Sequence, residues 1–286
     1  MRYVKGINPN FVLNYALLPR VIARLPQKSC YMKIYFLGTG TSQGIPVIGS
    51  NHPVCLSQDP RDKRLRVSVW VEVDGQSLVV DCGPDFRQQM LTSGCTRIDG
   101  LLFTHEHADH TAGLDDIRPF NFQHGPMPVF AESRVIDNLM QRYGYIFATE
   151  NRYPGAPAVQ IHSIDAEVPF TIGGVAIQPI RVWHGDLPVL GFRIGDFAYL
   201  TDVKTIEAAE LDKLKGLKVL VVNALREAPH DTHFNLQEAL DFVNLVQPEQ
   251  AYLTHISHHM GFHAEREKTL PASVFLAYDN LVLTLE

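Results

Sequence analysis

Residues 105–110, which run H-E-H-A-D-H, constrain this chain more than any other part of its sequence. The run follows a short apolar segment that predicts a buried strand. Because side chains alternate along an extended strand, His105 and His107 would point the same way and share one metal ion. Asp109 and His110 lie just past the turn and can face a neighbouring ion. Imidazole nitrogens and carboxylate oxygens are typical ligands of Zn²⁺, Mn²⁺ or Fe, and the absence of thiolates argues against a closed structural zinc site.

The chain is long enough to bury a core around such a site. Of its 286 residues, 45% are hydrophobic and 20% are charged, which excludes a disordered, collagenous or rod-like protein. A formal net charge of −6 gives no overall attraction to nucleic acid or to an anionic membrane. No apolar stretch approaches the roughly 20 residues of a membrane-spanning helix. We therefore expect neither a membrane nor a long nucleic acid as partner.

Cysteine usage and the distribution of charge indicate compartment and organisation. The four cysteines show neither C-x-x-C spacing nor the density of a secreted disulfide protein, which predicts a cytoplasmic location. Residues 1–31 carry five basic and no acidic side chains, and we interpret them as a dispensable N-terminal extension. A targeting or surface-binding segment is the alternative. Residues 32–286 predict a single α/β domain, because no internal repeat or linker interrupts them.

Periodicity predicts the elements of this domain. Helices are expected at 84–91, 133–143 and 235–246. Asp74-Gly75 predicts a hairpin between the second and third strands. The strands are expected at 33–37, 67–73, 77–80, 101–104, 175–180, 191–194, 198–200, 219–222, 251–254 and 281–285.

Six short motifs occur in a fixed order along the domain. They are G-T-G-T at 38–41, V-V-D-C-G at 79–83, T-H-E-H-A-D-H-T-A-G-L at 104–114, V-W-H at 182–184, L-T-D at 200–202 and L-T-H-I-S-H at 253–258. In this order they resemble the metallo-β-lactamase superfamily, and within it the cyclic phosphodiesterases of bacterial phosphonate degradation. The resemblance implies a four-layer αββα metallo-β-lactamase sandwich, with the site at the edge between its two sheets.

The resemblance also implies two metal positions. Their ligands are histidines and aspartates: His105, His107 and His184 at the first, Asp109, His110 and His255 at the second, Asp202 as the bridge, and Asp81 as a residue that orients ligands without binding metal. Two of the distant ligands, His184 and His255, directly follow strand-like segments, as His105 does. On its own, Asp202 would be taken as the N-cap of a helix near 203–210.

Hydrolysis is the expected reaction. Two divalent ions roughly 3.5–4 Å apart can bind a bridging hydroxide and stabilise both the entering and the leaving oxygen. Asp202 stands where the lactam-cleaving branch has cysteine, which points toward phosphodiesters or thioesters. His233 precedes a predicted helix, where the phosphodiesterase relatives place a catalytic histidine, and a solvated helix-start histidine is the alternative. We take His233 and Asp109 as the catalytic candidates.

Three functional hypotheses follow. The first is a phosphodiesterase for a small or cyclic phosphate ester, the second a thioester or lactone hydrolase on the same metals, and the third a metal-binding module without turnover. The related transfer-RNA 3′-processing nucleases carry a basic arm, and this sequence has no long Lys/Arg-rich insertion of that kind. Arg118 is a candidate phosphate contact, with an ion pair to Asp115 or Asp116 as the alternative. A homodimer is left open.

A third metal site marks a departure from the relatives. They carry C-x-C-x-x-C after the glycine turn, which joins a histidine in holding a structural zinc. The matching stretch here has Ser50 and His52 in place of the first two cysteines, and only Cys55 is kept. His52, Cys55 and His258 would give a three-ligand structural zinc site. The alternative is that the site has been lost and hydrogen bonds hold the loop.

Overall fold

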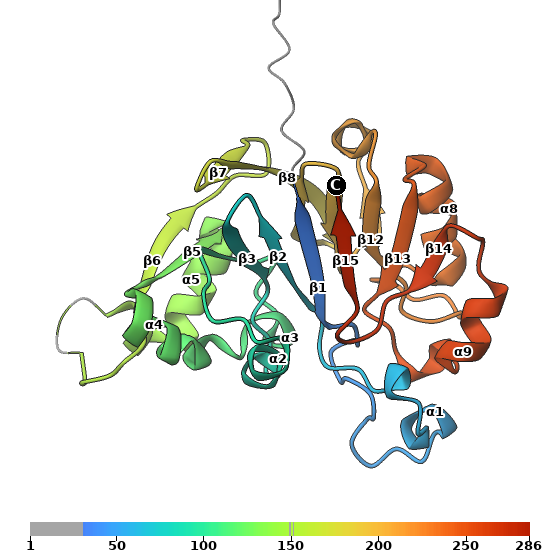
Figure 1. Ribbon diagram of the computed structural model, residues 1–286, viewed down its shortest axis with the longest axis horizontal. Coiled ribbons are helices and arrows are strands. Elements are labelled where there is room, and N and C mark those ends of the chain that lie inside the picture. Colours follow the sequence, from blue (N-terminus) through green and yellow to red (C-terminus); the bar gives the residue numbers. More distant parts are fainter. Residues whose placement is uncertain (1–30, 149, 151) are drawn as a thin grey trace, which may run out of the picture.

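The computed structural model describes residues 31–148, 150 and 152–286. The expected extension at 1–31 therefore lies outside the described residues, except for Tyr31. Two β-sheets face each other, and helices lie on the outer side of each sheet (Figure 1). Helices α2 (Phe86–Ser93), α4 (Arg118–His124) and α5 (Ser133–Arg142) pack against one sheet, and α8 (Leu236–Val246) packs against the other. The chain has the αββα order of layers that its motifs predicted.

The first sheet has seven strands. In the order β15-β1-β2-β3-β4-β5-β6 they are Val282–Leu285, Met32–Gly38, Ser68–Val73, Gln76–Val80, Gly100–Leu102, Met127–Ala131 and Val159–Ser163. Val73 pairs with Gln76 across the predicted hairpin turn between β2 and β3. Strands β3 to β6 run parallel, so their carboxyl ends meet at one edge of the sheet.

The second sheet has eight strands. In the order β11-β8-β9-β10-β12-β13-β14 they are Thr205–Ile206, Val175–His184, Leu187–Ile194, Phe197–Leu200, Val219–Asn223, Gln250–Thr254 and Val274–Leu276, with β7 (Phe170–Ile172) paired to β8. Strands β10, β12, β13 and β14 run parallel. Their carboxyl ends form the second edge from which a site can be built.

The helices are short in most cases. They are α1 (Pro53–Leu56), α2 (Phe86–Ser93), α3 (Ala108–Thr111), α4 (Arg118–His124), α5 (Ser133–Arg142), α6 (Gly144–Phe147), α7 (Ala208–Leu211), α8 (Leu236–Val246) and α9 (His263–Arg266). Single 3₁₀ turns occupy Pro60–Asp62, Leu114–Ile117, Asp212–Leu214, His258–Met260 and Glu267–Thr269.

Alternation along the strands explains the layers. In β1, Ile34 lies in the core between the sheets, whereas Leu37 lies in the core that α2, α4 and α5 cover. In β12, Val221 lies between the sheets and Leu220 faces α8. Both faces of the central strands are buried, as is usual for sheets covered on both sides.

Most of the predicted elements are present with small shifts at their ends. Strand β4 ends at Leu102, two residues earlier than predicted, and β11 and the short α7 replace the helix considered near 203–210. Strands β5, β6, β7 and β14 were not predicted. Strand β6 has the sequence V-Q-I-H-S and lies half exposed at the end of its sheet, so it lacks the continuous apolar run of a central strand.

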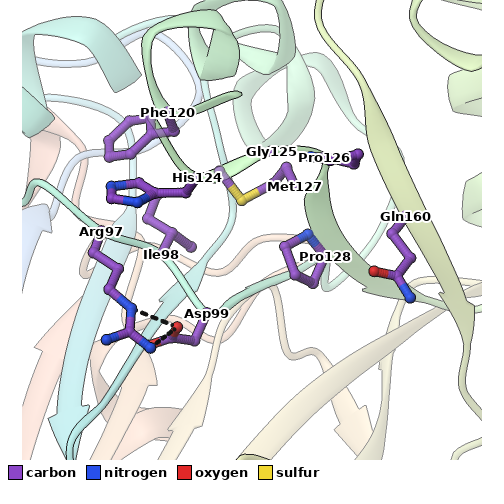
Figure 2. A pocket seen from close by; sticks show the side chains of 10 residues that line it. All are labelled: Arg97, Ile98, Asp99, Phe120, His124, Gly125, Pro126, Met127, Pro128 and Gln160. Carbon is purple, nitrogen blue, oxygen red and sulfur yellow. Dashed lines mark hydrogen bonds and ion pairs between the residues drawn. The ribbon is translucent and has the colours of Figure 1, made fainter. Parts of the chain in front are cut away.

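A cavity of about 440 Å³ opens on the outer side of the first sheet, beside α4 (Figure 2). It is lined by side chains of the loop before β4, of α4 and of the strands β5 and β6: Arg97, Ile98, Asp99, Phe120, His124, Gly125, Pro126, Met127, Pro128 and Gln160. None of the predicted site residues lines this cavity, so it is separate from the candidate site.

Candidate metal centre

The candidate ligands lie where strands of both sheets end. His105 and His107 follow β4 of the first sheet, and α3 begins directly after them. His184 is the last residue of β8, and His255 is the first residue after β13, both in the second sheet. The ends of strands from two sheets therefore bring distant parts of the sequence to one edge of the sandwich.

Three histidines form one side of the cluster. Nε2 of His105 lies 3.0 Å from Nδ1 of His107. The ring centroid of His184 is 5.4 Å from that of His107 and 6.1 Å from that of His105. The structure thus brings together the three residues expected at the first metal position.

Asp109, His110 and His255 form the other side. One potential ligand atom of each lies within 4.8 Å of those of the other two. Oδ2 of Asp109 is 3.3 Å from Nε2 of His110 and 3.7 Å from Nε2 of His255. These are the three residues expected at the second metal position.

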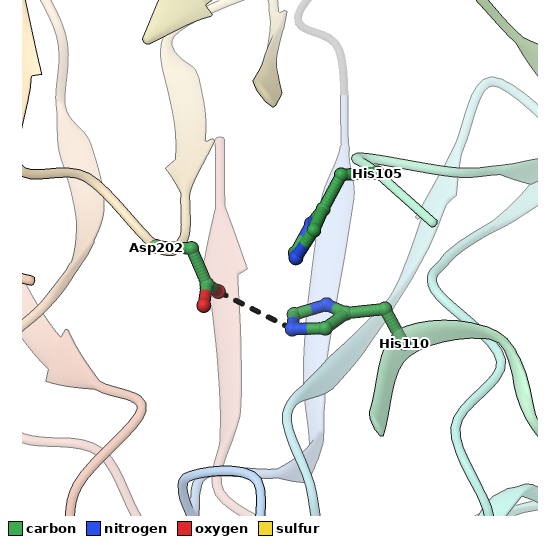
Figure 3. Close-up of side chains that lie close together, drawn as sticks. All are labelled: His105, His110 and Asp202. Atoms are coloured by element: carbon green, nitrogen blue, oxygen red, sulfur yellow. Dashed lines mark ion pairs between the residues drawn. The ribbon is translucent and has the colours of Figure 1, made fainter. Parts of the chain in front are cut away.

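Asp202 lies between the two sides. Its Oδ2 is 3.3 Å from Nε2 of His110, and its Oδ1 is 3.4 Å from Nε2 of His255. It also forms a group within ligand range with His105 and His110, whose rings converge on its carboxylate (Figure 3), and another that includes His184. A carboxylate within reach of both sides has the position of a bridging ligand.

Asp81 contacts the ligands from behind. Its Oδ2 is 2.7 Å from Nδ1 of His110, and it accepts hydrogen bonds from the backbone N–H and the hydroxyl of Thr104 at 2.9 Å. Because that hydroxyl donates its hydrogen to Asp81, it can only accept from Nδ1–H of His105, 3.0 Å away. Both rings are therefore held with Nε2 directed into the cluster, as carboxylates behind metal-bound histidines commonly arrange.

Three residues of the centre have a left-handed backbone. The φ angles are 65° at Asp81, 59° at Asp202 and 55° at His255. Residues other than glycine are uncommon in this region, and such strained positions cluster at functional sites. Each of the three closely follows a strand, so the sharp turn aims its side chain along the edge of the sandwich.

Two glycines allow the metal loop, residues 105–110, to approach the turn after β3. A Cβ on Gly83 would lie 2.1 Å from the carbonyl oxygen of Asp109, and one on Gly113 would lie 2.2 Å from the carbonyl oxygen of Gly83. Any larger side chain would overlap backbone atoms at both positions. The N–H of Cys82 donates to the carbonyl of His110 at 2.7 Å and so fastens the loop to this turn.

The charges of the cluster favour a cation. Burial raises the pKa of Asp202, but the neighbouring His255 and His110 bring it well below its usual value. Burial lowers the pKa of His110, but the carboxylates of Asp109 and Asp202 bring it well above its usual value. Burial lowers the pKa of His105. The carboxylates thus attract positive charge, and a divalent cation can take the place of the proton that they favour on His110.

Buried nitrogen atoms of the cluster lack hydrogen-bond partners among the described residues. They are Nε2 of His110, both ring nitrogens of His255 and Nδ1 of His233. Buried polar atoms in folded proteins are normally paired, so these nitrogens are suited to metal binding. Nitrogen and oxygen donors without a thiolate fit Zn²⁺, Mn²⁺ or Fe, as the sequence predicted.

His233 packs among the ligands. Its ring centroid is 4.3 Å from that of His184 and 4.7 Å from that of His255, and its Nδ1 is 3.7 Å from Oδ1 of Asp202. Only 10% of its side chain is exposed, which contradicts the alternative of a solvated histidine at a helix start. Burial, with a contribution from His255, lowers the pKa of His233 to about 3.

The chain around His233 is fixed on both sides. Helix α8 begins with a capping box, in which Asn235 and Glu238 each accept a hydrogen bond from the other's backbone N–H at 2.8 Å. The carbonyl of Thr232 accepts from Nδ1 of His184 at 2.6 Å. The loop that carries His233 therefore also orients one of the candidate ligands.

Comparison with known proteins decides the family. Residues 76–256, more than half of the chain, match the family described as Beta-lactamase superfamily domain. The chain belongs to the metallo-β-lactamase superfamily. A solved structure described as a new diphosphatase from the PhnP family is 37% identical, with a TM-score of 0.83 over 89% of this chain and 97% of that chain. Within this superfamily, the chain is a PhnP-like hydrolase.

Two proteins that are similar to this hydrolase in sequence are named for two different activities. An octanoyltransferase of Porphyromonas gingivalis (strain ATCC BAA-308 / W83) is 39% identical over 252 residues, which are 87% of this chain and 51% of that protein. The chain thus spans about half the length of that relative. A ribonuclease Z of Mycobacterium sp. (strain KMS) is 25% identical over 201 residues, 64% of this chain and 69% of that protein.

The hydrogen bonds of Arg118 go to residues outside the candidate metal centre. It donates to Oδ1 of Asp115 at 2.8 Å and to the hydroxyl of Tyr153 at 3.2 Å. The ion pair considered as an alternative is therefore present, and a contact between Arg118 and a phosphate stays a prediction.

In the described part of the chain, no helix combines the length and the hydropathy needed to cross a bilayer.

The residues considered for a third metal site make other contacts. Sγ of Cys55 accepts from the N–H of Val47 at 3.5 Å, and Nδ1 of His52 accepts from the N–H of Val54 at 3.3 Å. The ring of His258 lies 4.9 Å from that of His52. Within the described residues, these three do not form a group whose ligand atoms lie within 4.8 Å. Hydrogen bonds hold this loop, and the third site stays a prediction.

Some residues beside the centre were not predicted. Asn223 is buried at the end of β12, where it accepts from the N–H of Val203 at 2.6 Å and donates to its carbonyl at 3.0 Å. His230 lies with its ring 5.1 Å from that of His233. Arg134 hydrogen-bonds the metal loop from α5. These contacts join segments far apart in the sequence, and the one local signal is a polar residue directly after the apolar run of β12.

Proposed function

We propose that this chain is a dinuclear metal-dependent phosphodiesterase acting on a small or cyclic phosphate ester. The observation that carries the proposal is the buried position of His233 against His184, His255 and Asp202. A histidine at this position can contact a phosphate group that is bound to the metals. The 37% identity to a diphosphatase of the PhnP family and the likeness to ribonuclease Z support phosphate-ester chemistry.

The proposed metal ligands divide between two positions. When bound, a pair of divalent ions supplies Lewis acidity to the phosphoryl group and stabilises the oxygens that enter and leave. We propose Zn²⁺ or Mn²⁺ as the ions, and Fe fits the same donors. The ligands are His105, His107 and His184 at the first position, Asp109, His110 and His255 at the second, and Asp202 between them.

His233 and Asp109 are the proposed catalytic residues. Nδ1 of His233 faces Asp202, which leaves Nε2 as the nitrogen that can meet a substrate. From there its N–H can hold a nonbridging oxygen, and it can donate a proton to the departing alkoxide once an anionic phosphate beside the ring raises its pKa. The side chain of Asp109 is 14% exposed, so its carboxylate can accept a hydrogen bond from the attacking water.

A small substrate is proposed in preference to transfer RNA. The net charge of −6 and the lack of a long Lys/Arg-rich insertion between the motifs favour a small substrate over a long polyanion. We also propose that residues 32–286 act as one hydrolase domain and that 1–31 are dispensable for it.

A second candidate is a hydrolase for an acyl thioester or lactone on the same metals. The octanoyltransferase relative, 39% identical over 252 residues, favours it, although this chain matches 51% of that protein. In this case His233 would have a structural role. Assays of one metal-loaded preparation on a chromogenic phosphodiester, a cyclic phosphate, an octanoyl thioester and a lactone separate the two. Turnover of acyl substrates with none of phosphate esters would replace the first candidate by the second.

The role of His233 has its own prediction. We expect His233→Ala to keep its metals and to lower kcat on phosphodiesters by about 10²–10⁴, the usual contribution of a positioned general acid. Esters with poor leaving groups should lose most, because they depend on protonation of the alkoxide. Kinetics across a leaving-group series, beside metal analysis, measure this. The matched control is His230→Ala in the same loop, and equal losses in both variants would contradict the assignment.

A further inference from the structure

The first metal position draws its ligands from both sheets. His105 and His107 follow β4, whereas His184 ends β8. Three nitrogens can bind one ion only while these two sheet edges keep their separation. A backbone hydrogen bond from the N–H of Leu190 to the carbonyl of Thr104, 3.0 Å long, joins the edges, and α5 adds a second connection through its side chains.

Arg134, in the first turn of α5, reaches both edges with one guanidinium. Its Nη1 donates to the carboxylate of Glu106, the residue between the first two histidines of the metal loop. Its Nη2 donates to the carbonyl of Pro188 at 2.6 Å. Pro188 pairs with Trp183 in the β8–β9 hairpin, next to the pair that contains His184. One side chain therefore connects the metal loop to the hairpin that carries the third ligand.

A row of alternating charges extends this connection. Glu132, just before α5, accepts from Nη1 of Arg181 in β8 at 2.8 Å and lies 3.8 Å from Nη2 of Arg134. With Glu106 the row has four members, and their side chains are between 16% and 34% exposed. Partial shielding from water strengthens such pairs relative to fully exposed ones.

The other end of α5 holds the backbone of the metal loop. Nη2 of Arg142 donates to the carbonyl of Glu106 at 2.8 Å and to the hydroxyl oxygen of Thr111 at 2.7 Å. That hydroxyl donates in turn to the carbonyl of His107 at 2.8 Å. The loop is thus fixed relative to α5, and Arg134 fixes α5 relative to the hairpin.

We propose that Arg134 is a positioning residue that sets the separation of the metal loop and the β8–β9 hairpin, and thereby the metal affinity of the first position. Its contacts are with Glu106, Pro188 and Glu132, none of which is a proposed metal ligand. A planar guanidinium can donate to a carboxylate and a carbonyl at the same time, which an ammonium group does less well. The inference rests on the ligand assignment of the proposed function and is independent of the substrate.

Chelator competition tests this inference without any substrate. We expect Arg134→Gln to bind one metal equivalent about 10–100-fold more weakly, the usual loss when a residue behind a ligand is removed, and the other equivalent normally. The matched control is Arg97→Gln, since Arg97 pairs with Asp99 at 2.6 Å and is 59% exposed. Equal metal affinity in the two variants would overturn the proposal.

Two further variants separate positioning from a general effect on folding. Arg134→Lys should recover part of the affinity, because the charge opposite Glu106 returns without the planar fork. Adding Glu106→Gln to Arg134→Gln should cost little more than the single change, since both act through one contact. Additive losses, equal weakening of both equivalents, or a fall in the melting temperature of the metal-free protein large enough to explain the lost affinity would each contradict a positioning role.

Discussion

The first sheet supplies one side of the metal centre and the second sheet supplies the other, and the two sides are held in different ways. On the first sheet, one backbone bond from Cys82 to His110 fastens the metal loop, and its other contacts are polar side chains that reach it from the turn after β3 and from α5. On the second sheet, Asp202 and His255 have left-handed backbones with φ of 59° and 55°. There, backbone bonds clamp the next residue, Ile256, to Thr39 at 2.9 Å and to Thr41 at 3.1 Å.

This difference predicts how each side responds to substitution. A loop fixed by side chains can lose metal affinity through one polar change while the fold persists. A strand end fixed by backbone bonds changes only when the sheet around it changes. Asn223 is the point at which the second side depends on a side chain, because it replaces a backbone partner for Val203.

The largest effect is expected from Asp202, whose carboxylate lies near His110 of the first side and His255 of the second. The loaded protein should carry about two metal ions per chain, and Asp202→Ala should lose affinity for both, because its carboxylate lies within reach of both sides. We expect kcat to fall at least about 10³-fold, since a metal pair contributes several kcal/mol to the transition state. Metal analysis with kinetics measures this, and full occupancy with undiminished turnover would refute the bridge.

Asn223→Leu should weaken the second side by destabilising the fold around it. The N–H of Val203 would lose its partner, whereas its carbonyl would still accept from the N–H of Phe234 at 2.7 Å. One unsatisfied buried group costs about 1–3 kcal/mol, so we expect a loss of stability of that size. Metal binding and turnover should fall with it. The control is Asn121→Leu, because Asn121 likewise bridges backbone groups at 2.8–3.0 Å but lies away from the centre.

In that control, denaturant unfolding should report a comparable loss of stability while the remaining folded protein binds metal normally. A normal metal affinity in folded Asn223→Leu would show that the second side does not depend on this amide.

Asp81→Asn should weaken the first side with less damage to the fold. The amide keeps the volume of the side chain but offers an N–H₂ group where Thr104 needs an acceptor, so His110 and His105 lose their fixed orientation. We expect metal affinity about 10–100-fold lower and about 1 kcal/mol less stability. Chelator competition and thermal unfolding measure the two quantities. A stability loss as large as that of Asn223→Leu would erase the contrast between the sides.

The smallest effect is expected outside both sides, in the loop of α1. Cys55→Ala should leave the metal content unchanged, because Sγ of Cys55 is occupied by a hydrogen bond from Val47. Loss of this contact and of the buried sulfur should cost about 1 kcal/mol. Metal analysis on protein loaded with excess zinc is the measurement, and the loss of one zinc per chain would establish the third site instead.

The compact part of the site could be predicted from sequence, and the dispersed part needed the resemblance. Residues 105–110 place four candidate ligands in one loop, so their type and spacing are sufficient. Asp202 has no local mark, and the sequence around it equally predicted a helix N-cap. Only the meeting of the two sheets shows that its carboxylate faces His110 and His255.

The same distinction applies to the fold. A central strand such as β12 was predicted because both of its faces are apolar and buried. Strand β6 was missed because its pairing with β5, and not its composition, makes it a strand. Arg134 and Asn223 were missed for a related reason, since their partners are backbone and side-chain groups of other segments.

The spread of the proposed ligands along the chain has a consequence for the life of the protein. The first lies at residue 105 and the last at residue 255, so an ion held by them ties the two halves of the sandwich as a reversible cross-link. During synthesis the full set of proposed ligands can come together only after β13 has joined its sheet, because His255 follows that strand. Once the ions are bound, global unfolding has to release them first, which slows escape from the native state and protects the chain from proteases. In a cell that is short of metal, this protein would therefore have a shorter lifetime.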